Sequence, residues 1–312
     1  MNKKIKELDY NNLLFFDIET VRGEEVFDEN HPFYDVWAWK QRDKETNEIP
    51  ESKEVIEYYY NKAALFAEWG KIVCISVGYI NNEELHVKSF VGDEKGILTD
   101  FVNLVKKTGR MLAGFNLINF DVPYLRKRFF INGLEGYLTD KQGNDVYMKP
   151  WDLDASIFDL MVAWKGSGFV NASMDELAMC FGIPSSKDDM HGNEVSKYFY
   201  EGKIDEISEY CEKDVAVTAN ILRRWKGDSI LEPQIKKEVK DERTVLQKLY
   251  DTEELTDTIK KELEETLSKK KITKKDKDNL FKILLSVYQK KGERKQEKLD
   301  KEAEIKQFLD EI

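Results

Sequence analysis

The chain has 312 residues, of which 41% are hydrophobic and 35% are charged, and its formal net charge is −11. This length is sufficient for one large domain or two, and no apolar run reaches the ~18 residues that a membrane-spanning helix needs. The three cysteines are far apart and the N-terminus lacks an apolar stretch, so we expect neither a disulfide framework nor a secretory signal. These features predict a reduced, cytoplasmic protein with no membrane partner.

Charge and composition divide the chain near residue 227. Residues 228–312 contain 21 basic and 21 acidic residues, so the net charge of −11 lies entirely in residues 1–227. The first part also contains every tryptophan and every cysteine. We therefore expect two domains, 1–227 and 228–312. Because an acidic body binds polyphosphate weakly through its overall field, any nucleic acid must be held by local contacts.

Residues 1–227 alternate between strand and helix patterns. The apolar run 13–16 predicts a strand buried on both faces, and Asn81-Asn82 predicts a hairpin turn between two later strands. The full series is a strand at 13–16, strands at 72–79 and 85–90, a helix at 97–107, a strand at 111–115, a helix from 121 to about 133, and a helix at 204–225. This order predicts an α/β fold with a mixed sheet flanked by helices.

Two segments depart from this pattern. Residues 22–70 form an insertion with ten aromatic residues, which either stack on single-stranded bases or pack a local helical subdomain. Residues 228–312 predict charged helices, one of them from Thr273 to Gly292. The basic run Lys269–Lys275 is either a phosphate contact or a solvated loop, and the helices could instead dock a replication or repair protein.

Four carboxylates stand at positions that a fold would normally fill with apolar side chains or helix caps. Asp17 and Glu19 come directly after the apolar run 13–16. Because side chains alternate along a strand, both should point to the same face, ~7 Å apart. Asp121 begins a predicted helix, and Asp214 lies one helical turn after Tyr210. Taken singly, each fits a helix cap or a surface position. Taken together, they predict a divalent-metal site that acts on phosphates, because buried ionised carboxylates need a cation or protons.

The order of these residues resembles the motifs of the DEDD superfamily of 3′–5′ exonucleases. The run Phe16-Asp17-Ile18-Glu19-Thr20 matches the first motif, Asn116 to Asp121 matches the second, and Tyr210 to Asp214 matches the third. Glu209 stands where the histidine branch has its histidine, so the resemblance is to the tyrosine branch, DEDDy.

More narrowly, the chain is similar to the predicted exonucleases related to the proofreading domain of B-family DNA polymerases. The flanking stretches Glu68–Ser76 and Ile183–Gly192 extend the similarity beyond the motifs, and it covers about residues 10–227. The resemblance implies a ribonuclease H-like mixed sheet.

It also implies a role for each motif side chain. Asp17 would bridge two metal ions, Glu19 and Asp214 would hold the ion that activates water, and Asp121 would help hold the second. Mg²⁺ suits such hard oxygen ligands, and Mn²⁺ should substitute. With a reference pKa of ~10, Tyr210 would aim the water by a hydrogen bond and would not act as a base. Asp159 is interpreted as an anchor of a helix or loop and not as a fifth ligand.

Four further residues are candidates for binding substrate. Asn116 could hydrogen-bond the terminal nucleotides, and Phe120 either stacks on a base or packs in the core. The Thr20 backbone could meet the 3′ end, and Lys187 could contact a phosphate. By contrast, Leu125 and Phe129 are expected in the core.

The predicted function is a stand-alone, metal-dependent 3′–5′ exonuclease. It would hydrolyse single-stranded DNA or unpaired 3′ ends to nucleoside 5′-monophosphates, in DNA replication, repair or proofreading. The alternatives are an exoribonuclease of the same branch, a non-catalytic module that binds 3′ ends, and a proofreading subunit recruited by a partner through residues 228–312.

Overall fold

The structure is a computed structural model that describes residues 3–134, 157–184, 190–235, 261 and 273–288. The chain divides into two compact units, Met1–Glu238 and Val239–Ile312. Within these described ranges, no helix is long and apolar enough to cross a membrane. The division into domains 1–227 and 228–312 stays a prediction.

Six strands of the first unit form one mixed sheet in the order β5-β4-β1-β2-β3-β6. The strands are β1 (Leu13–Arg22), β2 (Gly70–Asn81), β3 (Glu84–Val91), β4 (Met111–Gly114), β5 (Ile157–Asp159) and β6 (Pro233–Ile235). β2 runs antiparallel to β1 and β3, whereas β4 is parallel to β1 and β5 is parallel to β4. The order β3-β2-β1-β4-β5 with an antiparallel second strand is that of the ribonuclease H-like fold, so the predicted α/β fold class is confirmed.

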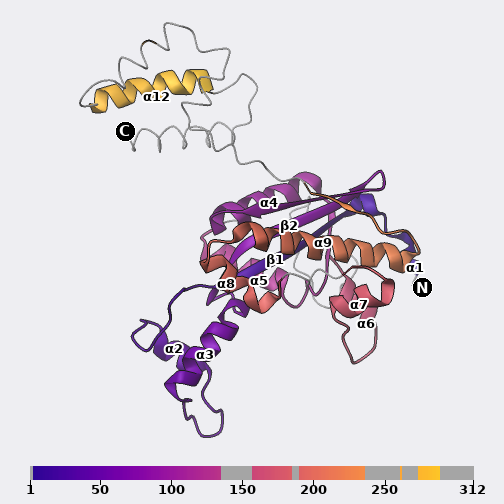
Figure 1. The fold of residues 1–312 in the computed structure, drawn as a ribbon, viewed down its shortest axis with the longest axis horizontal. Helices are drawn as coiled ribbons and strands as arrows, with labels where there is room; N and C mark the ends of the chain where they lie inside the picture. Colours follow the sequence, from indigo (N-terminus) through magenta and orange to yellow (C-terminus); the bar gives the residue numbers. More distant parts are fainter. Residues whose placement is uncertain (1–2, 135–156, 185–189, 236–260, 262–272, 289–312) are drawn as a thin grey trace. The chain divides into compact units, whose positions relative to one another are not determined.

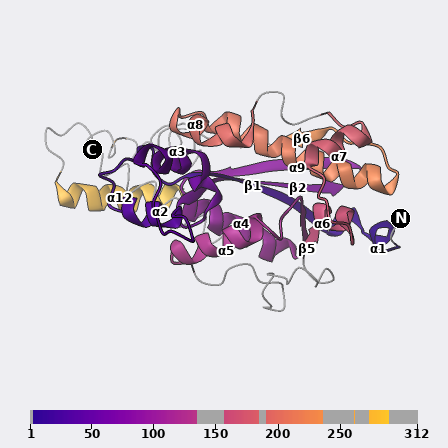
Figure 2. The same cartoon turned by 90° about the horizontal axis from the view of Figure 1, so that it is seen from below.

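Helices cover both faces of this sheet, as Figure 2 shows with α9 on one side and α4 and α5 on the other. Among the described residues, the helices of the first unit are α1 (Lys3–Glu7), α2 (Tyr34–Lys40), α3 (Ser52–Lys62), α4 (Glu94–Thr108), α5 (Asp121–Ile131), α6 (Leu160–Lys165), α7 (Met174–Phe181), α8 (Val195–Tyr200) and α9 (Ile204–Lys226). Alternation along β1 explains the layers: Leu14 and Phe16 join the core beneath α4 and α5, while Leu13 and Phe15 join the core beneath α9.

β1 extends beyond the predicted strand. The apolar run predicts a strand at 13–16, but the strand continues to Arg22. Its pairing with β2 shifts register between Glu19 and Thr20, which is a β-bulge. Asp17 and Glu19 therefore lie within the central strand, as their expected alternation onto one face requires.

The predicted hairpin between β2 and β3 is confirmed. Asn81 pairs with Glu84, so the turn has two central residues, Asn82 and Glu83. Both have positive φ, 49° and 60°, as a type I′ turn requires. The twist of this turn matches the twist of the strands, which keeps β3 aligned beside β2.

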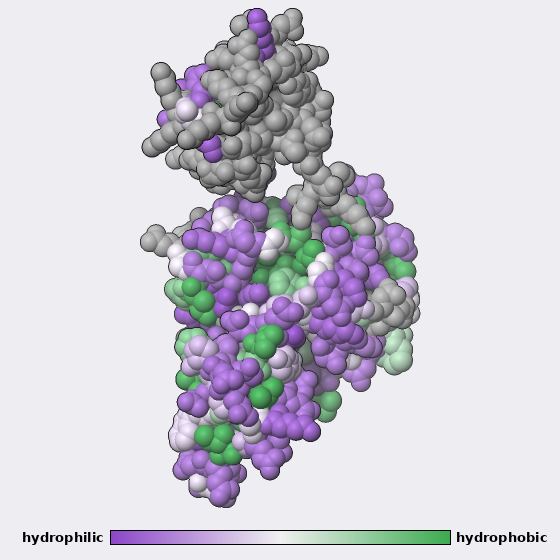
Figure 3. All heavy atoms as spheres, turned by 60° about the vertical axis from the view of Figure 1, so that its left-hand side comes forward, coloured by the Kyte–Doolittle hydropathy of each residue, from purple (hydrophilic) through white to green (hydrophobic). Residues whose placement is uncertain are grey.

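The insertion after β1 forms a small helical subdomain around α2 and α3 (Figure 1). Phe27, Trp37 and Tyr59 are at most 1% exposed and form the centre of its own core. Phe33 and Trp39 remain more than half exposed. Figure 3 shows several separate hydrophobic patches on one otherwise largely hydrophilic face of the molecule. The buried aromatic side chains of the insertion thus pack against one another within this subdomain.

In the second unit, the described residues include α12 (Lys274–Tyr288). Thr273 Oγ1 accepts a hydrogen bond from the Asp276 backbone, and the Asp276 side chain accepts one from the Thr273 backbone. This reciprocal cap confirms the predicted helix start at Thr273. Most of the basic run Lys269–Lys275, and the predicted helix end at Gly292, lie outside the described residues.

Candidate active site

A cleft of about 550 Å³ opens beside the central strand β1. Its volume is within the ~300–1,000 Å³ range of small-molecule sites. All four carboxylates predicted as ligands line it: Asp17, Glu19, Asp121 and Asp214. Because they come from β1, α5 and α9, the fold brings together groups that are up to 197 residues apart in sequence.

Asp17 and Glu19 lie on the α9 side of β1, where Glu19 is buried and Asp17 is partly buried. Glu19 is 8% exposed, and its backbone pairs with Cys74 of β2. Burial raises the pKa of Asp17 well above its usual value, and the nearby Asp121 and Asp214 raise it further. Burial is also the main cause that raises the pKa of Glu19, followed by Asp17 and Asp214. The pair therefore favours either protons or a cation.

Asp121 is the first residue of α5 and not its N-cap, which is Phe120. Its Oδ1 accepts a hydrogen bond from the backbone amide of Ile18 at 3.3 Å, so it is tied directly to β1. Burial raises its pKa to about 7, although this hydrogen bond acts in the opposite direction. Asp121 thus faces the same cleft as the β1 carboxylates while it opens the first turn of α5.

Tyr210 and Asp214 lie one turn apart on α9, as their spacing predicts. Tyr210 is 6% exposed and its hydroxyl hydrogen-bonds the Asp214 side chain. Burial raises the pKa of Tyr210 above its usual value, and the charges of Asp214 and Glu19 raise it further. At neutral pH the phenol is therefore protonated, which makes it a hydrogen-bond donor and not a base.

Asp159 organises the loop that connects β4 to α5. Its Oδ1 accepts a hydrogen bond from the Asn116 amide and its Oδ2 accepts one from the Ile118 amide, both at 3.0 Å. It also caps α6 by accepting from the Met161 amide at 3.0 Å. Its side chain is fully buried and Asn116 has a positive φ of 64°. The interpretation of Asp159 as a helix and loop anchor is confirmed.

The four residues predicted to bind substrate have different positions. Asn116 and Phe120 line the cleft, and Phe120 also packs against the core beneath α4 and α5. Thr20 is absent from the residues that line the cleft, and its hydroxyl donates to the Ala64 carbonyl at 2.9 Å. Lys187 lies outside the described residues. Leu125 and Phe129 are buried in the core, as predicted.

One wall of the cleft has no counterpart among the predicted site residues. It consists of Asn171, Ala172, Ser173 and Met174, in the chain between α6 and the start of α7. No motif marks this segment. The only local signal is a capping box in which Ser173 accepts from the Glu176 amide and Glu176 accepts from the Ser173 amide.

The donor atoms of the cleft fit a hard divalent cation. One oxygen each from Asp17 and Glu19 and the Cys211 thiol sulfur lie within 4.8 Å of one another. Burial and a hydrogen bond with Cys74 raise the pKa of the Cys211 thiol well above its usual value, so it stays neutral. Carboxylate oxygens are then the ionised ligands, and Mg²⁺ and Mn²⁺ prefer such ligands.

A ribonuclease H-like sheet with a carboxylate-lined cleft at its central strand defines the class of this domain. A sequence model of predicted 3′–5′ exonucleases related to the exonuclease domain of PolB matches residues 65–262, more than half of the chain, and the chain belongs to this family. The matched region contains Asp121, Tyr210 and Asp214, whereas Asp17 and Glu19 precede it.

Among solved structures, the family B DNA polymerase from the hyperthermophilic archaeon Pyrobaculum calidifontis is similar to this chain. The two share 18% sequence identity with a TM-score of 0.44, over 68% of this chain and 24% of the polymerase chain. The chain thus spans about a quarter of the length of that polymerase. No curated protein sequence matches the chain.

Proposed function

We propose that the protein is a metal-dependent 3′–5′ exonuclease of the tyrosine branch, which hydrolyses single-stranded DNA or unpaired 3′ ends. The observation that carries this proposal is the convergence of Asp17, Glu19, Asp121 and Asp214 on one cleft. Asp17 and Glu19 lie outside the region that the family model matches, so their position in the cleft supports the proposal independently.

In this proposal, the carboxylates would hold two Mg²⁺ ions. Asp17 would contact both ions, Glu19 and Asp214 would hold one, and Asp121 would help hold the other. When bound, such ions supply an activated water and stabilise the leaving oxygen. The raised carboxylate pKa values support this assignment, because a cation would offset the burial and the mutual repulsion that raise them.

Tyr210 would aim the attacking water. The protonated hydroxyl of Tyr210 has one hydrogen to donate, and Asp214 already accepts it. The hydroxyl would therefore orient the water by accepting a hydrogen bond from the water, or by turning its own hydrogen from Asp214 to the water. Asn116 would hydrogen-bond the terminal nucleotide and the Phe120 ring would contact its base. Because the overall charge is −11, these local contacts would provide most of the affinity for the strand.

A time course with oligonucleotides labelled at the 3′ or the 5′ end tests the proposal. We expect loss of single nucleoside 5′-monophosphates from the 3′ end, only when Mg²⁺ or Mn²⁺ is present. The double variant with Asp17→Ala and Asp214→Ala should be inactive. Retention of activity in that variant would disprove the assigned mechanism. Matched RNA oligonucleotides distinguish a deoxyribonuclease from an exoribonuclease, and binding without hydrolysis would indicate a non-catalytic module.

A further inference from the structure

The chain between α6 and α7 exposes two large apolar side chains beside the cleft. Phe169 is 99% exposed and Val170 is 84% exposed. Two adjacent apolar side chains left in solvent gain nothing from the hydrophobic effect, and beside a cleft such a pair offers contact area to an apolar part of a ligand. Figure 1 shows this segment as a loop that extends outward between α6 and α7.

This apolar tip is next to a wall of the cleft. Asn171, Ala172 and Ser173 line the cleft together with the carboxylates. Since consecutive Cα atoms are 3.8 Å apart, the Phe169 Cα lies within ~8 Å of the Asn171 Cα. The tip therefore lies beside this wall of the cleft, within reach of a strand whose 3′ end occupies it.

The tip itself is uncharged, whereas the start of α7 is acidic: Asp175 and Glu176 follow the tip, and Glu176 lines the cleft. Residues 166–174 contain no charged side chain, although residues 1–227 carry the whole net charge of −11. An uncharged stretch repels phosphates less than the rest of an acidic body. Lys165, immediately before this stretch, supplies one basic group.

The chemistry of the tip suits a nucleobase. An exposed aromatic ring stacks on any base, and this contact is tolerant of sequence. The cleft already contains two partly exposed phenyl rings, Phe115 and Phe120. A strand that enters the cleft could thus have apolar contacts both within it and at the tip.

We infer that Phe169 and Val170 hold the last bases of a single strand while its 3′ end occupies the carboxylate cleft. This inference rests on the proposed function and names a positioning surface for it. Phe169 stacks on a base within the last few nucleotides, and Val170 packs against the same base. The backbone holds this tip between two fixed points, the C-cap of α6 at Gly166 and the N-cap of α7 at Ser173.

The test compares the full chain with three variants: Phe169→Ala, Phe169→Trp and Phe130→Ala. Phe130 is the matched control because it is also an exposed phenylalanine, at 59%, and lies nine residues beyond Asp121, ~13 Å along α5. Hydrolysis of a 3′-labelled single-stranded DNA gives KM and kcat with Mg²⁺. Binding is measured separately with Ca²⁺, as quenching of 2-aminopurine at the last, second-last or tenth nucleotide from the 3′ end.

For Phe169→Ala we expect KM to rise about 5- to 100-fold, the effect of losing one base stack, with kcat within about twofold of the original. Quenching should fall at the last two positions and remain unchanged at the tenth. Phe169→Trp should retain both properties, and Phe130→Ala should change neither. Unchanged KM and quenching in Phe169→Ala, or equal losses at all three positions, would overturn the inference.

The two readouts separate this inference from the proposed function. If the unmodified chain hydrolyses DNA and Phe169→Ala behaves identically, the exonuclease assignment stands and the role of the tip is wrong. If the unmodified chain binds DNA and quenches 2-aminopurine through Phe169 without hydrolysis, the role of the tip is right and the exonuclease assignment is wrong. If the unmodified chain neither binds nor hydrolyses DNA, both are wrong.

Discussion

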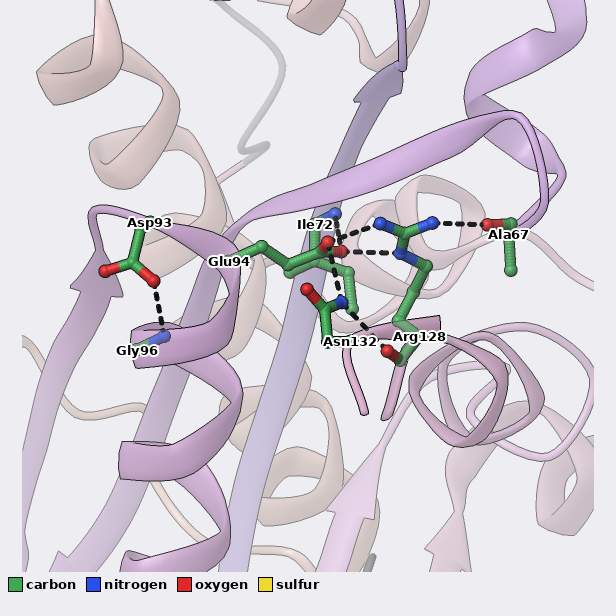
Figure 4. Close-up of polar contacts among 7 residues, drawn as sticks. All are labelled: Ala67, Ile72, Asp93, Glu94, Gly96, Arg128 and Asn132. Atoms are coloured by element: carbon green, nitrogen blue, oxygen red, sulfur yellow. Dashed lines mark hydrogen bonds and ion pairs between the residues drawn. The ribbon is translucent and has the colours of Figure 1, made fainter. Parts of the chain in front are cut away.

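Arg128 and Glu94 form a largely buried ion pair that joins α5 to α4 (Figure 4). Arg128 Nε donates to Glu94 Oε1 at 2.7 Å, and each side chain is 11% exposed. The same Glu94 oxygen accepts from the Ile72 amide of β2, and Arg128 Nη1 donates to the Ala67 carbonyl. Since Arg128 lies two turns after Asp121, this pair fixes the helix that presents Asp121 to the cleft.

Removal of Arg128 should be strongly destabilising. Arg128→Met leaves the Glu94 carboxylate buried and without its cation, so we expect a loss of about 3–5 kcal/mol in the free energy of unfolding. Urea denaturation measures it. The neighbouring Lys127→Met is the control, because Lys127 and Glu68 are 54% and 52% exposed and their ion pair should contribute less than about 1 kcal/mol. Equal losses in the two variants would show that burial of the pair is unimportant.

Asp159→Ala should reduce both stability and nuclease activity. The change leaves the buried amides of Asn116, Ile118 and Met161 without their acceptor, at about 1–3 kcal/mol for each unsatisfied group. Because the first two amides belong to the loop that carries Phe120 and Asp121, kcat/KM on single-stranded DNA should fall at least about tenfold. Asp93→Ala removes an exposed helix cap, at the Gly96 amide, and should cost about 1 kcal/mol with no loss of activity. Unchanged activity in Asp159→Ala would contradict the positioning role.

The sequence was sufficient to predict the central strands because their signal is local, and it predicted that the four carboxylates meet because their order along the chain matches one set of family motifs. The run Leu13–Phe16 has the pattern of a buried strand, and the motif spacings place Tyr210 and Asp214 on one helix face. β5 escaped prediction because its three residues are too few to show any periodicity. Thr20 could not be placed because its hydroxyl donates to the carbonyl of Ala64, 44 residues away, a contact that depends on tertiary structure.

A different reason explains why the sequence did not predict the wall of the cleft at residues 171–174. Its residues carry no catalytic chemistry, and only the packing of α7 against α9 brings them to the carboxylates. Asp159 was easier to interpret, because an aspartate directly before a helical pattern is a common cap. The additional hydrogen bonds of Asp159 to the loop before α5 depend on β4 and β5 being neighbours, which sequence periodicity does not report.

Tyr210→Phe tests whether the phenol orients water. The change removes the hydroxyl that bonds Asp214 but preserves the ring and leaves all four carboxylates in place. We expect kcat to fall about 10- to 1,000-fold, with a much smaller change in the Mg²⁺ concentration required for half-maximal rate. Single-turnover rates over a Mg²⁺ titration measure both quantities. Full activity would contradict the orienting role, and an equal loss of metal affinity would instead assign Tyr210 to holding Asp214.

Stability of the metal-free protein should fall as pH rises. The pKa of Asp121 is raised to about 7 in the folded chain, so between its unfolded value near 4 and pH 7 the folded state binds more protons than the unfolded state. The stabilisation is present below the unfolded pKa and is lost as pH rises through the folded pKa. Between pH 5.5 and 8 the loss from this group is about 2 kcal/mol, and the raised pKa values of Asp17 and Glu19 act in the same direction.

Thermal melts in EDTA at the two pH values measure this effect, at about 2–4 °C per kcal/mol for a domain of this size. Asp121→Asn should be less sensitive to pH than the original chain, because its amide oxygen can still accept from Ile18 but does not titrate. Added Mg²⁺ should stabilise the original chain more at pH 8 than at pH 5.5, since a cation competes with protons for the same oxygens. If the metal-free chain is equally stable at both pH values, the fold does not raise the pKa of these carboxylates. A cation would then not be needed in this cleft to neutralise them.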